Sequence, residues 1–313
     1  MISVKRTTVI ATLLILLSGY TSTLAQSARI KPITNNAYFL EISMMQETES
    51  ENSELANNLS LELSCNIIFQ LRDQLENSIY MFDASYENLE LSFFSPQVDY
   101  YISSSQNDFK FIREYLAQLE QAEFPVTLSS NGQCLHVTGI DSLISSFQAK
   151  SKISTEQRQL FIKTIKEAFG EKAFKSLINL ALHIYPNPAE EEDGINTYLF
   201  FNAREIPIRE NFFIQSAGDQ MNRVQGIGVI AEKIDTIQWN DFTLISSLKG
   251  NQTYDFLVYE KNGWIKEGIS KQKIHSVSKI SGHSDLPEGL KIPSLTITDY
   301  AFRGGILDND TKK

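Results

Sequence analysis

The sequence predicts an α+β protein in which a long curved antiparallel sheet, or an open half-barrel, packs on a central group of helices. Long stretches near both ends alternate apolar and polar residues, which is typical of strands with one wet face. Residues 106–184, between these stretches, have the period of amphipathic helices. Two Asn-Gly pairs, at Asn131 and Asn262, indicate tight hairpins. Because long antiparallel strands coil, the sheet should curve around an apolar interior.

The first 26 residues have the features of a secretory signal peptide. Lys5 and Arg6 precede an apolar run at residues 9–17, and small residues lead to Ala25 and Gln26. The run is about half of the ~20 residues that a membrane-spanning helix needs, which favours cleavage over a retained anchor. We therefore expect a secreted or periplasmic protein, cleaved near Ala25–Gln26, with no transmembrane anchor.

The N-terminal strands are expected at residues 38–44, 59–72 and 80–93. Residues 47–54, between the first two, are acidic enough for an exposed loop. In the third run the apolar residues change from even to odd positions, so a bulge or bend near Glu87 and Asn88 should return them to one face.

The central region should begin with a helix capped by Asp108. Its apolar face holds Ile112, Tyr115, Leu116 and Leu119. A hairpin follows, in which Asn131–Gly132 suits a type I′ turn. Two or three helices then occupy residues 141–184, and Pro186 prevents their continuation.

The rest of the chain is β-rich. We expect strands at residues 198–203, 211–216, 224–231, 241–248, 253–259, 264–268, 273–280 and 295–302. The predicted organisation is a signal peptide (1–25), N-terminal strands plus central helices (26–186), an acidic linker (187–194), a C-terminal β-rich region (195–307) and a tail (308–313). The two large regions are expected to form one continuous structural unit.

Composition limits the partners. With 28 Lys and Arg against 38 Asp and Glu, the net charge is −10, which argues against nucleic acid and anionic membrane surfaces. The chain has 2 cysteines, Cys65 and Cys134, which in an oxidising compartment could form a disulfide. Cys65 lies on the apolar side of a strand pattern and could equally be a small buried hydrophobe.

No motif indicates catalysis. The 4 histidines include no pair at i,i+4, and the Ser-Gly-His-Ser sequence at Ser281 lacks the Gly-x-Ser-x-Gly setting of a hydrolase. Gly226-Ile227-Gly228 is followed by strand residues, so it indicates a bulge or close backbone packing rather than nucleotide binding. The acidic run at residues 190–193 lacks the spacing of a calcium loop. We expect no enzyme, no catalytic residue, no cofactor and no metal site.

The 19 Phe and 12 Tyr residues supply large apolar area. They could simply pack the core, or the concave side of the sheet could be only partly filled and leave an apolar pocket for a lipid-like ligand. The predicted walls of that pocket are Met44, Leu61, Leu63, Ile67, Phe69, Phe82 and Leu91.

The motifs Phe-Pro-Val-Thr-Leu-Ser-Ser-Asn-Gly at residues 124–132 and Tyr-Glu-Lys-Asn-Gly-Trp at 259–264 resemble an uncharacterised family of secreted Bacteroidota proteins. This resemblance implies a periplasmic or surface protein of unknown activity. In its order of strands and helices, the chain is also similar to periplasmic lipoprotein carriers, whose open half-barrel is closed by helices. Two functions are therefore expected: a non-catalytic carrier for an apolar ligand, or a cell-envelope module that binds another protein with a fully packed core.

Overall fold

The computed structural model describes residues 29–34, 36–50, 59–75, 78–95, 98–103, 110–146, 155–186, 194–201, 204–239, 242–281 and 289–307. The predicted signal peptide, the cap at Asp108, the acidic run and the tail lie outside these residues. The strands are β1 Ala37–Ser50, β2 Leu59–Leu75, β3 Ile79–Ser95, β4 Val98–Ser103, β5 Phe124–Ser129, β6 Cys134–Val137, β7 Ile195–Phe201, β8 Arg204–Gly218, β9 Met221–Trp239, β10 Phe242–Tyr259, β11 Ile265–Ser281 and β12 Leu290–Leu307. The helices are α3 Lys110–Glu120, α4 Ile140–Ser146, α5 Thr155–Phe169 and α6 Glu171–Leu182.

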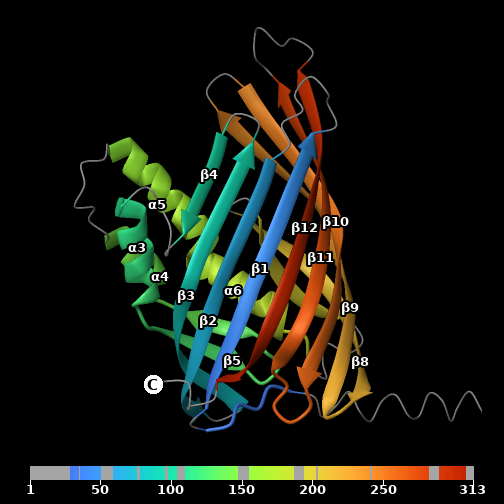
Figure 1. Ribbon diagram of the computed structural model, residues 1–313. Coiled ribbons are helices and arrows are strands. Elements are labelled where there is room, and N and C mark those ends of the chain that lie inside the picture. The colour runs from blue at the N-terminus through green and yellow to red at the C-terminus, as the bar shows by residue number, and fades with distance from the viewer. Residues whose placement is uncertain are drawn as a thin grey trace, which may run out of the picture.

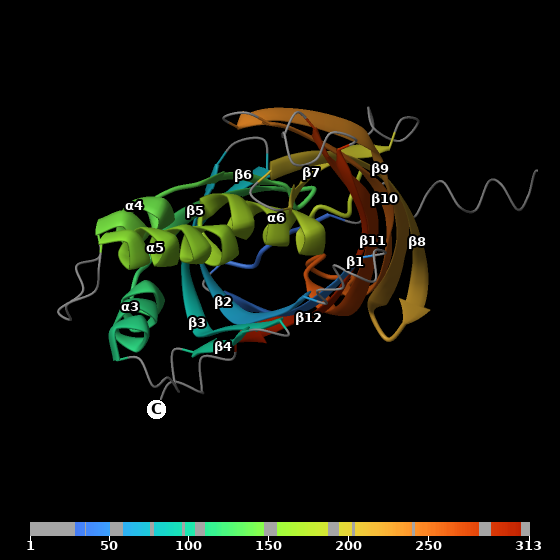
Figure 2. The ribbon, with the colours of Figure 1, turned by 90° about the horizontal axis from the view of Figure 1, so that it is seen from above.

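All described strands belong to one 12-stranded antiparallel sheet with the order β6-β5-β3-β2-β1-β12-β11-β10-β9-β8-β7, and β4 pairs β3 outside this path. The sheet is strongly curved (Figures 1 and 2). Within the described residues no ladder joins β6 to β7, so the sheet is open. The predicted large, open antiparallel sheet with helices is confirmed.

Helix α6 lies inside the curve of the sheet, while α3, α4 and α5 gather beside β3 and β5 (Figure 2). It contacts both edge strands, β6 and β7. Its buried side chains include Phe174, Leu177, Ile178 and Leu180, which lie on more than one face of the helix. A helix that is apolar on most sides is a core element, so α6 fills the open side of the sheet instead of covering it from outside.

The N-terminal and C-terminal strands meet at the centre of the sheet. β1 pairs with β2 on one side and with β12 on the other, from Ala37 opposite Leu307 to Ser50 opposite Ser294. The strands on either side of the acidic run therefore share one sheet and one concave face.

On the side of the sheet that ends in β6, the two ends of β3 pair with different strands. Residues Glu90–Ser95 pair with β4, which the sequence did not indicate, and residues Ile79–Ala84 pair with β5. Between them, the predicted bulge is confirmed: Asn88 has φ +53° and the β2–β3 register shifts after Ser64. Both Tyr86 and Leu89 consequently face the core, and the Leu89 N–H donates to Glu120 Oε1 of α3 at 2.9 Å.

Three expectations about local structure were wrong. β1 continues into the predicted acidic loop as far as Ser50, because Thr48 pairs with Thr296 and their hydroxyls lie 3.0 Å apart; residues 51–54 of that loop lie outside the described residues. The β5–β6 turn is not type I′, since only Gly132 there has positive φ, at +86°. A Cβ at Gly132 would lie 1.7 Å from the Leu182 carbonyl oxygen, so the turn packs closely against the end of α6.

The third error concerns the C-terminal strands. The eight predicted segments form six longer strands, because residues 241–248 and 253–259 join in β10 and residues 264–268 and 273–280 join in β11. The predicted breaks lie where Gln252, Ser270 and Gln272 interrupt the apolar pattern. These three side chains are buried, so the polar positions are part of the interior.

The lower half of the interior, beside the start of β1 at the bottom of Figure 1, contains the buried aromatic side chains of the core. The Trp264 ring is fully buried and lies 4.7 Å from Tyr38, 5.5 Å from Phe69 and 6.4 Å from Phe82, measured between ring centroids. Its indole N–H donates to the Phe39 carbonyl at 3.0 Å. Residues 29–34 close this end, since the Ile30 N–H donates to Ser130 and the Lys31 N–H to Asn262, both at 2.8 Å.

Candidate functional site

A row of buried polar side chains crosses the concave face of the sheet above the aromatic core. In the register of the ladders, Thr298 of β12 lies opposite Gln272 of β11, which lies opposite Gln252 of β10. The row continues through Gly228 of β9 to Glu210 of β8. We call Thr298, Gln272, Gln252 and Glu210 the polar belt; each is at most 3% exposed. Buried polar groups are rare without a specific partner, which makes the belt the leading candidate site.

Glu210 is the ionisable member of the belt. Its Oε2 accepts a hydrogen bond from Thr197 Oγ1 at 3.0 Å, and its Oε1 forms a second with the Tyr254 hydroxyl, which accepts the hydrogen bond of the carboxyl proton when Glu210 is neutral. Burial raises the pKa of Glu210 to about 8, and the Thr197 hydrogen bond only partly offsets this effect. The carboxyl group is therefore protonated at neutral pH, and the belt carries no fixed charge.

Glycines in β9 allow β8 and β10 to touch across this strand. A Cβ at Gly226 would lie 2.4 Å from the Phe212 ring, and one at Gly228 would lie 3.4 Å from both Gln252 and Glu210. With no side chain between them, Phe212 and Tyr254 approach to 5.1 Å between ring centroids and Tyr254 reaches Glu210. The prediction that these glycines serve close packing is confirmed.

The two glutamines form a chain of amide hydrogen bonds. Gln272 Nε2 donates to Gln252 Oε1 at 3.0 Å, and Gln252 Nε2 donates to Ser270 Oγ at 2.8 Å. This direction leaves Gln272 Oε1 without a partner, and Thr298 Oγ1 beside it also has none. The belt is thus satisfied at its Glu210 end and unsatisfied at its Thr298 end.

Above the belt, the concave face has two parts that differ in burial and polarity. Towards β8 and β9 lies a small buried cluster of Ile206, Ile208, Ile230, Leu248 and Ile274. On β1, β2 and the far ends of β10–β12 most concave-facing side chains are only half-buried, with Thr296 buried among them, and hydroxyls lie among apolar groups. We call this second surface the upper concave face; it consists of Gln46, Thr48, Ser50, Leu61, Leu244, Ser246, Ser276, Ser278, Ile280, Leu290, Ile292 and Ser294.

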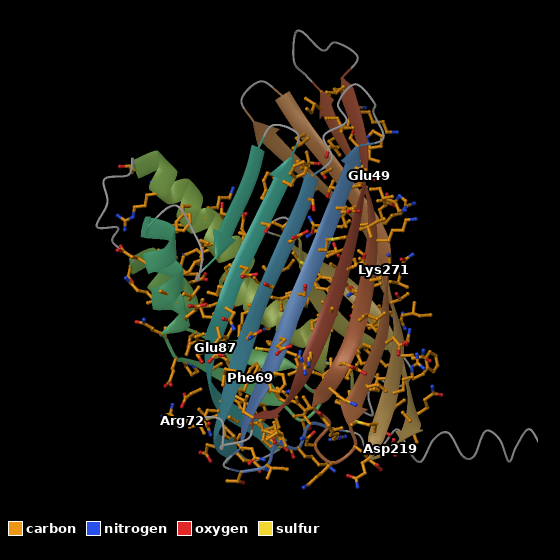
Figure 3. All side chains as sticks on the ribbon, in the orientation of Figure 1. Glu49, Phe69, Arg72, Glu87, Asp219 and Lys271 are labelled. Atoms are coloured by element: carbon orange, nitrogen blue, oxygen red, sulfur yellow. The ribbon has the colours of Figure 1, made fainter. Side chains whose placement is uncertain are left out.

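The seven predicted wall residues do share the concave face, but they lie in two different surroundings. Figure 3 places Phe69 in the lower half of β2, where its ring lies 5.8 Å from Phe82 and 6.3 Å from Phe174 of α6. Ile67, Phe69 and Phe82 are thus packed into the core. Met44, Leu63 and Leu91 belong to the same core cluster, just below the level of the belt, whereas Leu61 is half-buried beside Gln46.

Both cysteines are buried as free thiols, so the structure has no bond between Cys65 and Cys134. Burial raises the pKa of each thiol to about 12. His183 is also buried; its Nε2 lies 3.0 Å from Asn131 Nδ2, and burial lowers its pKa to about 4. Among the described residues, no group of His, Cys, Asp or Glu could hold a metal ion. None of the described helices is long and apolar enough to cross a membrane.

A surface hollow on the helices offers a different kind of site. It is lined by Asp141, Gln159, Ile162, Lys163, Lys166, Glu167 and Lys172. Its cations are partly paired, since Lys163 lies 3.9 Å from Glu167 and Lys172 lies 3.6 Å from Glu205. This mixed charge gives the hollow no clear preference for an anion.

The fold defines a class of protein: an open antiparallel sheet whose concave side is filled below by helix and aromatic side chains and is polar at mid-height. The chain belongs to a family of unknown function, DUF6263, whose model matches residues 77–265. No curated protein matches the sequence. The source group and the likeness to lipoprotein carriers stay predictions.

Several solved structures are weakly similar. Lipovitellin, in a structure describing lipid-protein interactions, has 10% identity and a TM-score of 0.45 over 88% of this chain and 26% of that chain. DynF from the dynemicin pathway of Micromonospora chersina has 8% identity and a TM-score of 0.25, covering 90% and 86% of the two chains. An outer membrane channel from Pseudomonas putida F1 has 6% identity and a TM-score of 0.22, covering 88% and 97%. At these TM-scores the likeness carries no inference about function, and this chain spans about a quarter of lipovitellin.

Proposed function

We propose that the protein is a non-catalytic binding or carrier protein, which holds an amphiphilic, lipid-like ligand on the upper concave face. One observation carries this proposal: below the belt the concave face is covered by helix α6 and aromatic rings, whereas above it most concave-facing side chains of β1, β2 and β10–β12 are only half-buried. A concave surface of mixed aliphatic and hydroxyl groups suits a ligand with an apolar chain and a polar group.

The chemistry of the belt supports binding rather than catalysis. Both oxygens of Glu210 are engaged by Thr197 and Tyr254, and the carboxyl group is 3% exposed. A general acid or base must reach the proton that it transfers, directly or through one water. Glu210 is better placed to fix the geometry of the interior than to meet a substrate.

A matched pair of variants on β12 tests the proposal. Ile292 faces the concave side and Leu295 the convex side, and both are half-buried. We expect Ile292→Asp to weaken the binding of a fluorescent fatty-acid probe to the delipidated protein by about tenfold, because the new carboxylate meets the apolar chain. Leu295→Asp should leave binding within about twofold. Failure of the unmodified protein to bind either fluorescent fatty-acid probes or uncharged fluorescent lipid probes above background would end the proposal.

A second candidate function rests on the convex face. Exposed apolar side chains lie together on β8 and β9: Phe213 is 69% exposed, and Ile227 and Val229 are each 55% exposed. Phe213 lies opposite Gln225, two residues before Ile227, so the three side chains are neighbours on one face. An apolar group of this kind favours contact with another protein of the cell envelope.

A further inference from the structure

The unsatisfied end of the polar belt has two hydrogen-bond acceptors without a partner. Gln272 Oε1 and Thr298 Oγ1 make no hydrogen bond to any residue that the structure describes, although each residue is only 1% exposed. A buried polar atom without a partner is destabilising, so native proteins keep few of them. Two such atoms on one face indicate a place where a partner binds.

The two atoms can serve the same ligand group. Gln272 and Thr298 lie directly opposite each other in the β11–β12 ladder and point to the same face. Side chains in this relation have Cβ atoms about 5 Å apart. A single hydroxyl or amide group placed between them can therefore reach both atoms.

The charge around these atoms selects an uncharged ligand group. The belt itself holds amide and hydroxyl groups, with Glu210 at the other end. The ion pair nearest along the strands, Lys271–Asp299 at 3.2 Å, lies on the convex face, where Figure 3 shows Lys271. Because none of the described residues places a cation beside it, a carboxylate or phosphate would be buried unpaired, at a large desolvation penalty.

The Thr298 end of the belt is also the end next to the solvent-accessible surface. Gln46 of β1 lies opposite Thr298, and Leu61 of β2 lies opposite Gln46. Both side chains are half-buried parts of the upper concave face. An elongated ligand lying along this face would have its polar end within reach of Thr298.

We propose that Thr298 and Gln272 bind the hydroxyl or N–H group of an uncharged amphiphile, whose apolar chain lies on the upper concave face. Gln272 Oε1 accepts the ligand's hydrogen bond, and Thr298 Oγ1 accepts or donates a second. This inference rests on the proposed carrier function and adds the class of ligand to it: a neutral alcohol or amide, in preference to a fatty acid anion.

The test compares three ligands of equal chain length: 1-dodecanol, its methyl ether and dodecanoate. Their affinities are measured by displacement of an uncharged fluorescent fatty-alcohol probe from the delipidated full-length protein. The alcohol can donate a hydrogen bond, whereas the ether and the carboxylate cannot. We expect the wild-type protein to prefer the alcohol to the ether by about fivefold, the value of one additional hydrogen bond, and to bind dodecanoate most weakly.

The variants are Thr298→Val and, as a control, Thr296→Val. Thr298→Val removes an unpaired hydroxyl, so it should fold with unchanged or raised stability. Because the Thr298 hydroxyl can donate to the oxygen of either ligand, the variant should bind both alcohol and ether about fivefold more weakly, while the preference for alcohol, which depends on Gln272 Oε1, remains. Thr296 faces the same side, but its hydroxyl is already bonded to Thr48 at 3.0 Å, so Thr296→Val should leave both affinities unchanged.

Each contrary outcome has a separate meaning. If the wild-type protein binds alcohol and ether equally, or prefers dodecanoate, the assignment of Thr298 and Gln272 is wrong while the carrier function stands. If neither alcohol nor ether displaces the probe, or the probe itself does not bind, the carrier function fails.

Discussion

Glu210→Gln is expected to abolish most of the loss of stability that the wild-type protein shows between pH 6.5 and 8. Burial raises the pKa of folded Glu210 to about 8, whereas an unfolded glutamate has a pKa of about 4.3. The folded state therefore holds its proton more tightly. The resulting stabilisation is complete below the unfolded pKa and is lost as the pH rises through the folded pKa. At about 1.4 kcal/mol per pH unit, the wild-type protein should lose about 2 kcal/mol over this window.

The window from pH 6.5 to 8 isolates Glu210 from the other buried groups. The folded pKa of His183 is lowered to about 4, so its contribution is fully present above the unfolded value and is lost only as the pH falls below about 6.5. The thiols of Cys65 and Cys134 have pKa values raised to about 12, so they act only above about pH 8.

Urea unfolding at half-unit steps of pH measures the effect. The control is Glu205→Gln, which changes an exposed carboxylate on the same strand and should keep the wild-type slope. Parallel pH curves for wild type and Glu210→Gln would show that Glu210 is not buried as a neutral acid.

Phe69→Ala is expected to lower the free energy of unfolding by about 4 kcal/mol, the usual cost of removing a fully buried phenylalanine. The Phe69 ring is enclosed by Phe82, Phe174 and Trp264, so the truncation would leave a cavity in rigid surroundings. Leu61→Ala should cost only about 1 kcal/mol, because Leu61 is half-buried on the upper concave face.

Urea unfolding at pH 6.5 and probe binding together distinguish a residue that stabilises the core, Phe69, from one that contacts the ligand, Leu61. Leu61→Ala should weaken the binding of the fatty-acid probe, while Phe69→Leu, which keeps most of the volume, should leave it unchanged. The opposite pattern, with binding sensitive to Phe69 and not to Leu61, would place the ligand in the lower half and contradict the division of the concave face.

Strand positions and faces could be predicted where one face is continuously apolar. The alternation in residues 59–72 placed Cys65 and Phe69 on the buried side, and the change of phase before Leu89 located the bulge. Turn type and the ends of strands were harder to predict from the sequence, because they depend on contacts with residues far along the chain. The carbonyl of Leu182 requires Gly132 to lack a side chain, and Thr296 extends β1 through its acidic end.

The candidate site was missed for a related reason. Gln252, Ser270 and Gln272 interrupt apolar alternation, and polar residues ordinarily indicate the end of a strand. Their burial follows from register: β10, β11 and β12 bring them together with Thr298, and the glycines of β9 let Glu210 join the row. Their spacing could have indicated that they are buried, since Ser270 and Gln272 alternate in phase with the apolar Ile274 and so lie on the same, buried face of the strand.

Native mass spectrometry of the protein purified from its producing cells tests the carrier function most directly. The account predicts a bound small apolar mass at one per chain, which is neutral, bears a hydroxyl or amide group, and is released on delipidation. A stable complex with another protein chain and no small ligand would contradict it and favour the convex face of β8 and β9 as the functional surface.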